Sequence, residues 1–225
     1  MTGAFISIEG PEASGKTTQA RRLVARCEAL GLQVTLVREP GGSKTGDAIR
    51  EVVQFNRAGE ALHAKTEALL FAASRAQMVT YSVLPALEQG GVVISDRYVD
   101  TTLAYQGYGR QIDVSVIREI NTFATGGLMP GLTILLDLDI EKVFSRLSRR
   151  EAAQGTGFDR IESEPRDFHE RVRQGFLTLA EENPDRFLVL HGDQPEDTLH
   201  ERIWERAELL VAPLCGGAGA LPHEC

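Results

Sequence analysis

Cysteine is scarce in this 225-residue sequence, with only three, at positions 27, 215 and 225. Their spacing fits neither a zinc site nor a disulfide framework, which excludes a cysteine-stapled secreted module. Long apolar runs are also missing, and no stretch approaches the length that crosses a bilayer. The opening residues, MTGAFISIEG, lack a basic segment followed by a long apolar one. We therefore expect a cytoplasmic protein with reduced cysteines.

Positive charge is in the minority, because 24 Lys and Arg stand against 32 Asp and Glu, for a formal net charge of −8. Broad binding to nucleic acid or to an anionic membrane needs a basic field, so we expect neither as a partner. A few local arginines still suffice to bind a small anion. At 42% hydrophobic residues, a chain of this length can bury the core of one domain.

The sequence has no internal repeats, and short apolar stretches alternate with helical patterns. Strands are predicted at residues 5–9, 34–37, 92–94, 132–137 and 186–190. Helices are predicted near residues 17–30, 46–55, 65–87, 101–105, 114–123, 141–150, 168–179 and 197–211. Nearly all-apolar strands between helices are typical of a parallel sheet covered on both faces. We expect an α/β domain over residues 1–212 with five parallel strands, two insertions near 40–75 and 148–165, and a frayed tail over 213–225.

A phosphate-binding motif follows the first predicted strand. The run Gly10-Pro11-Glu12-Ala13-Ser14-Gly15-Lys16-Thr17 matches G-x-x-x-x-G-K-[ST] in full and opens a predicted helix, as the motif requires. Glycines let backbone N–H groups approach a triphosphate closely, and Lys16 supplies a cation for its β- and γ-phosphates. The sequence therefore predicts a nucleoside triphosphate site from Gly10 to Thr18.

Two oxygen ligands are predicted for Mg²⁺ beside this motif. The Thr17 hydroxyl can bind the ion directly. Asp96 ends the third predicted strand, and ligands of parallel sheets gather outside the carboxyl ends of the strands. Asp96 is thus a second candidate ligand, although a carboxylate at this position could instead cap the next helix.

Further residues point to a second substrate. Glu12 lies inside the phosphate loop, where a carboxylate is electrostatically costly unless it contacts Mg²⁺ or an acceptor. Phe71 and Arg75 are four residues apart on one predicted helix face, where a base could stack and be hydrogen-bonded. The spacing alone is equally compatible with a Phe71 that packs in the core and an Arg75 that is exposed to solvent. Arg97 and the Tyr105-Gln106 pair add a cation, an aromatic ring and an amide.

Together these segments resemble the bacterial thymidylate kinase family. The resemblance rests on EGPEASGKTT, REPGGS, the FAASRAQ helix, DRYVDTTLAYQG and DRIE at residues 159–162, and it covers about residues 4–190. It implies the fold of a nucleoside monophosphate kinase of the P-loop NTPase type with a mobile lid. It also implies transfer of the γ-phosphoryl group of ATP to dTMP, with Mg²⁺, for dTTP synthesis. The family is typically dimeric, and the long helix at 65–87 has apolar surface to spare for a homodimer.

The resemblance also implies residue roles. Phe71 would stack on thymine and Arg75 would bond its exocyclic oxygen. Arg50 and Arg97 would hold the monophosphate. Thr102 and Gln106 would contact the base, while Tyr105 would crowd the sugar 2′ position. Glu12 would lie near the 3′-hydroxyl and the metal.

In this family a charge-stabilising arginine lies either in the P-loop or in the lid. This P-loop has none, so the resemblance assigns the role to the lid, where Arg150 fits by position. Arg146, Arg149 and Arg160 are the neighbouring candidates. A simpler interpretation is that Arg149 and Arg150 only favour a helix C-terminus.

The expected reaction is ATP + dTMP → ADP + dTDP. Lys16, Mg²⁺ and a lid arginine would neutralise charge, with Glu12 and Arg97 placing the acceptor, and no general base is needed because the dTMP phosphate is already anionic. Two alternatives remain open: a kinase for another small acceptor, such as AMP or a guanine nucleotide, and a non-catalytic ATP-dependent switch.

Overall fold

The computed structural model describes residues 3–55, 59–155 and 157–215 and contains the predicted parallel sheet. Its strands are β1 (Ala4–Glu9), β2 (Val34–Arg38), β3 (Val92–Asp96), β4 (Leu132–Asp137) and β5 (Phe187–His191). All pairings are parallel, in the order β2-β3-β1-β4-β5. The α/β fold class is therefore confirmed. Most of the predicted tail, residues 216–225, lies outside the described part.

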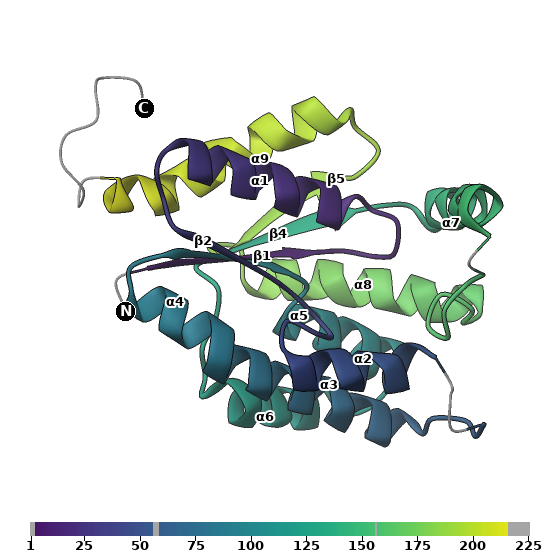
Figure 1. Ribbon diagram of the computed structural model, residues 1–225. Helices are drawn as coiled ribbons and strands as arrows, with labels where there is room; N and C mark the ends of the chain where they lie inside the picture. Colours follow the sequence, from purple (N-terminus) through teal and green to yellow (C-terminus); the bar gives the residue numbers. More distant parts are fainter. Residues whose placement is uncertain (1–2, 56–58, 156, 216–225) are drawn as a thin grey trace.

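One face of the sheet is covered by α1 (Lys16–Ala29) and α9 (Glu196–Val211), which lie together above it in Figure 1. Successive strand residues alternate between faces, so Ile6 and Ile8 of β1 pack towards these helices while Phe5 packs on the other side. Burial on both faces explains why the central strands read as continuous apolar runs.

The opposite face carries most of the other helices (Figure 1). They are α2 (Lys44–Gln54), α3 (Ala64–Met78), α4 (Leu84–Glu88), α5 (Val99–Thr102), α6 (Val114–Thr125) and α8 (Arg166–Glu182). Two π-helical segments interrupt the regular winding: η1 (Val79–Val83) joins α3 to α4, and η2 (Leu103–Gly109) follows α5. The helix predicted over 65–87 is thus continuous but contains a wider turn, a feature often found near functional sites.

The outer side of α3 is more apolar than a solvent-facing surface requires. Leu69 is 57% exposed and Tyr81, on η1, is 70% exposed, whereas Ala68 and Phe71 face the core. Of the apolar residues on this part of α3, Leu69 and Ala73 are exposed, whereas Leu70 packs against the core. None of the helices in the described ranges combines the length and hydrophobicity needed to span a bilayer.

The segment between β4 and α8 is more ordered than the sequence indicates. The helix predicted to end at Arg150 continues as α7 (Ile140–Gln154). The insertion predicted near residues 148–165 includes a turn in which Ile161 and Glu162 are buried. Asp159 stabilises this turn, since its carboxylate accepts hydrogen bonds from the backbone N–H groups of both residues, at 2.9 and 2.8 Å.

Candidate active site

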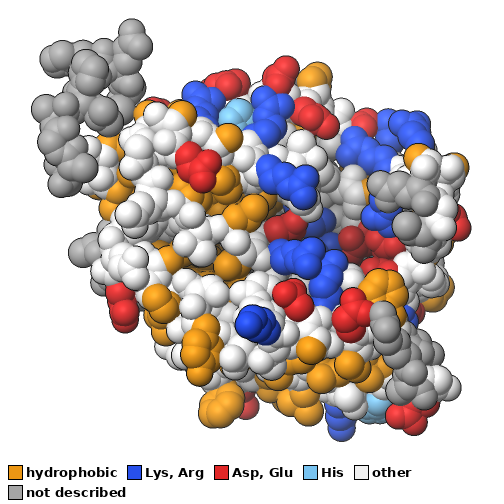
Figure 2. Space-filling view, in the orientation of Figure 1, with side chains coloured by type: hydrophobic (Ala, Val, Ile, Leu, Met, Phe, Trp, Pro, Cys, Tyr) orange, Lys and Arg blue, Asp and Glu red, His pale blue; other side chains and the backbone are white. Residues whose placement is uncertain are grey.

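A cavity of about 1330 Å³ opens at the carboxyl ends of the strands. The loops after β1, β2 and β3 form its walls together with the α7–α8 segment. Basic and acidic side chains crowd around this hollow, while hydrophobic side chains are more frequent over the rest of the visible face (Figure 2). The parallel topology explains the gathering, because it brings the ends of all strands to one edge.

The loop after β1 has the backbone of a phosphate cradle. Gly10 has φ +140°, and a Cβ there would meet the Leu136 carbonyl oxygen at 2.5 Å. Gly15, with φ +98°, begins α1, so the helix N-terminus points into the cavity. The loop curls around Lys16, whose ammonium donates to the Pro11 carbonyl at 2.6 Å and to Ser14 Oγ at 3.4 Å.

Lys16 is only 6% exposed, and burial makes its ammonium group easier to deprotonate. Burial lowers its pKa to about 8 from an ordinary 10.5, and the neighbouring Arg97 lowers it in the same direction. An anion in the cradle would oppose both effects, because its negative charge favours the ammonium form. The buried ammonium is therefore suited to binding a polyphosphate.

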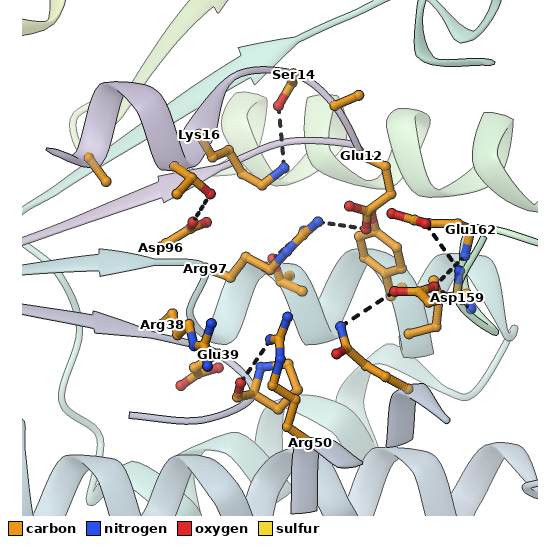
Figure 3. Close-up of a pocket in the computed structure, with 18 of the residues that line it drawn as sticks. Glu12, Ser14, Lys16, Arg38, Glu39, Arg50, Asp96, Arg97, Asp159 and Glu162 are labelled. Atoms are coloured by element: carbon orange, nitrogen blue, oxygen red, sulfur yellow. Dashed lines mark hydrogen bonds and ion pairs between the residues drawn. The ribbon is translucent and has the colours of Figure 1, made fainter. Parts of the chain in front are cut away.

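Thr17 and Asp96, the two candidate Mg²⁺ ligands, meet at the cradle; Figure 3 shows Asp96 below the phosphate loop. The Thr17 hydroxyl donates to Asp96 Oδ2 at 2.5 Å, because the β1–β3 register places the end of β3 beside the loop. Within the described ranges, no cluster of three or more His, Cys, Asp or Glu side chains is arranged to hold a metal. A hydroxyl and a carboxylate with an open side instead suit Mg²⁺, which keeps water and phosphate ligands.

Arg97 and Glu12 form the ion pair at the centre of the cavity (Figure 3). Arg97 has φ +75°, an uncommon left-handed backbone, and its Nη2 lies 2.6 Å from Glu12 Oε1. The Tyr105 hydroxyl donates to the same oxygen at 3.0 Å. Burial opposes ionisation of Glu12, but Arg97 and Lys16 outweigh it and lower its pKa to about 2. Glu12 is thus an anion held beside the cradle.

A second group of cations lies across the cavity from Lys16. Arg50, on α2, lines the cavity and donates to the Pro40 carbonyl at 3.0 Å. Burial lowers the pKa of Arg50, and repulsion from Arg38 and Arg97 lowers it further. These three arginines gather positive charge on this side of the cavity. Arg38 was not predicted from the sequence, although its place at the end of a strand was a usable signal.

The predicted base-binding residues divide into two groups. Phe71 and Tyr105 line the cavity. Arg75, Thr102 and Gln106 do not line it and are fully or almost fully buried. The Arg75 guanidinium binds Glu39 through Nε and Nη2, Asn121 through Nη1 at 2.6 Å, and Thr102 Oγ1 through Nη2 at 2.6 Å. Every nitrogen of Arg75 therefore has a protein partner, an anchoring role that the sequence did not reveal.

The four candidate lid arginines have different surroundings. Arg150 and Arg160 line the cavity, and Arg150 Nη2 donates to Glu162 Oε2 at 2.6 Å. Arg146 instead donates to the backbone carbonyls of Ala13 and Gly192, both at 3.1 Å, so it braces the phosphate loop from outside. Arg149 is exposed and is not among the lining residues.

Comparison with known proteins gives a consistent result. The family model described as thymidylate kinase matches residues 8–203. A thymidylate kinase from Deinococcus radiodurans is 50% identical over 90% of this chain and 95% of its own length. One from Pelotomaculum thermopropionicum is 43% identical over 98% of this chain and all of its own. The crystal structure of thymidylate kinase from Ehrlichia chaffeensis superposes with a TM-score of 0.73 at 31% identity, covering 92% of this chain and 99% of the other.

Proposed function

The chain belongs to the thymidylate kinase family, and we propose that it transfers the γ-phosphoryl group of ATP to dTMP, yielding ADP and dTDP for dTTP synthesis. The main support within the molecule is that one cavity holds both the Lys16 cradle and the Arg50–Arg97 group. Two cationic sites facing each other are what in-line transfer between two phosphorylated nucleotides requires.

On the donor side, the cradle from Gly10 to Thr18 binds the ATP phosphates, with Lys16 as the point charge. Arg150 is the arginine assigned to neutralise the transferring phosphoryl group, because it lines the cavity, whereas Arg146 is bonded to backbone and Arg149 is turned outward. Arg160 also lines the cavity, but its Nε is bonded to the Val53 carbonyl on α2. Thr17 and Asp96 would hold Mg²⁺, which supplies neutralising charge and orientation for the β- and γ-phosphates when bound.

On the acceptor side, Arg97 and Arg50 bind the dTMP phosphate, with Arg38 adding to the local positive potential. Phe71 stacks on the base, while the Tyr105 ring, fixed by its bond to Glu12, excludes a 2′-hydroxyl. Glu12 lies near the 3′ side of the sugar. This reaction needs no general base, since the phosphate of dTMP is an anion at neutral pH. Arg75, Thr102 and Gln106 form the layer that supports these contacts.

Two further proposals concern the setting of the enzyme. The exposed apolar side chains of Leu69 on α3 and Tyr81 on η1 support assembly as a homodimer. The composition supports a cytoplasmic location, and neither nucleic acid nor membrane is proposed as a partner.

The proposed reaction is tested by measuring ADP release with ATP, Mg²⁺ and one acceptor at a time. We expect dTMP to be turned over with the highest kcat/KM among dTMP, dUMP, dGMP, AMP and shikimate, and dTDP to be the product. Preference for AMP or a guanine nucleotide would identify a different monophosphate kinase. ATP binding without any acceptor-dependent product would indicate a switch instead.

A pH dependence is expected from the lowered pKa of Lys16, which is about 8. Below that pH the ammonium is charged and attracts ATP, whereas above it the free enzyme loses the charge. The ATP KM should therefore rise above pH 8, by up to about tenfold per pH unit. Calorimetry at pH 8.5 in two buffers of different ionisation enthalpy should show proton uptake when ATP binds. An ATP affinity that stays constant through pH 9 would contradict this assignment.

A further inference from the structure

A buried carboxylate at the start of α3, Glu67, joins parts of the site that lie far apart in sequence. Its side chain has no exposed surface. Gln106 Nε2 donates to Glu67 Oε1 at 2.8 Å, and Arg110 donates to both carboxylate oxygens at 3.0 Å. Arg160 Nη2 lies 2.5 Å from Oε2. None of the roles proposed above uses Glu67.

Each partner of Glu67 belongs to a different functional segment. Gln106 follows Tyr105 on η2, and Glu67 itself precedes Phe71 by one turn of α3. Arg160 belongs to the turn at residues 159–164, in which Glu162 holds Arg150. Arg160 Nε also donates to the Val53 carbonyl on α2, at 2.9 Å. One carboxylate therefore links the nucleoside side of the cavity to the turn whose Glu162 holds Arg150.

The contacts of Glu67 with Arg110 and Arg160 depend on the negative charge of its carboxylate. Burial opposes ionisation of Glu67, but hydrogen bonds from Arg110 together with its charge outweigh burial and hold the pKa of Glu67 below its ordinary value. Without this anion, the buried parts of Arg110 and Arg160 would face each other as like charges. Arg110 keeps one other acidic partner, Glu164, at 2.6 Å.

The same bond fixes the direction of the Gln106 amide. A carboxylate only accepts hydrogen bonds, so Gln106 must present its NH₂ group to Glu67. Its Oε1 is then turned away, and it is buried without a hydrogen-bond partner among the described residues. Because Gln106 is fully buried and does not line the cavity, its bond to Glu67 anchors η2 from behind the nucleoside side of the site.

We propose that Glu67 is a positioning residue that couples the two substrates, because its carboxylate joins α3 and η2, which carry Phe71 and Tyr105, to Arg160 of the 159–164 turn. Binding of dTMP against Phe71 and Tyr105, which lie on the two elements that Glu67 joins, then also favours the position of residues 159–164 beside the cradle. By linkage, ATP tightens dTMP binding to the same extent. This inference rests on the proposed function.

The test is calorimetric binding of dTMP with and without Mg²⁺ and the non-hydrolysable analogue β,γ-imido-ATP. For the wild type we expect the analogue to tighten dTMP binding by at least about fivefold. Glu67→Gln, which keeps the size of the side chain but removes its charge, should reduce this ratio to below about twofold. Arg160→Met should do the same while leaving the bonds of Glu67 to Gln106 and Arg110 in place.

Glu164→Gln is the matched control, because it removes a carboxylate from Arg110 without touching Gln106 or Arg160. It should keep the wild-type ratio. Thermal unfolding of each variant separates a loss of folding from a loss of coupling, and Arg160→Met provides the result if Glu67→Gln does not fold. A wild-type ratio near one, or an unchanged ratio in Arg160→Met, would overturn the inference. A wild type that neither binds nor phosphorylates dTMP would instead refute the proposed function.

Discussion

Replacing Lys16 with methionine is expected to lower kcat/KM for ATP by about 10²–10³-fold, a loss of about 3–4 kcal/mol of transition-state stabilisation. The ammonium is enclosed by the phosphate loop and bonded to the Pro11 carbonyl, so it is already positioned before ATP arrives. No other lysine lines the cavity within the described part of the chain. A water molecule cannot restore the missing charge.

The same change should not weaken the fold. Burial already disfavours the charged form of Lys16, as its lowered pKa shows, and methionine fills similar space without charge. The thermal midpoint should therefore stay near that of the wild type. Lys65→Met is the matched control, since Lys65 is exposed at the start of α3 and away from the cradle. If Lys16→Met kept more than about a tenth of wild-type kcat/KM, the proposed donor site would be wrong.

Arg150→Ala is expected to lower kcat by about 10³-fold while changing the ATP KM by less than about tenfold. An arginine that acts on the transferring phosphoryl group stabilises charge that develops in the transition state rather than in bound ATP. Arg150 suits this role because its guanidinium is held at the cavity by Glu162, while its side chain is still 37% exposed and has room to move. Steady-state kinetics with both substrates varied separates the two parameters.

The neighbouring arginines provide the controls for this prediction. Arg149→Ala removes an adjacent, exposed guanidinium and should leave kcat within about twofold of the wild type. Arg146→Ala removes the brace on Ala13 and should act mainly on the ATP KM. If Arg150→Ala retained wild-type kcat and Arg160→Ala lost it, the role would belong to Arg160.

The sequence alone determined the strands, the cradle and the edge at which the site lies, because these depend on local pattern. All-apolar stretches specify strands buried on both faces, and the glycine spacing from Gly10 to Gly15 specifies a loop that approaches phosphate. The pairing of Thr17 with Asp96 followed from one further rule, that parallel strands end at the same edge. Helix ends were less well predicted, as the extension of α7 beyond Arg150 illustrates.

Only the tertiary structure decided which polar side chains face the cavity and which are anchored behind it. Arg75 has the helical spacing of a ligand contact, yet it is bonded to Glu39, which lies 36 residues away in the chain. Arg146 and Arg150 lie on one helix but differ in whether they meet backbone or cavity. Nothing in the sequence indicates that Glu67 binds several side chains, because these partners come from η2 and the 159–164 turn. A buried charge acquires its role from partners brought together by folding, and sequence periodicity carries no information about such partners.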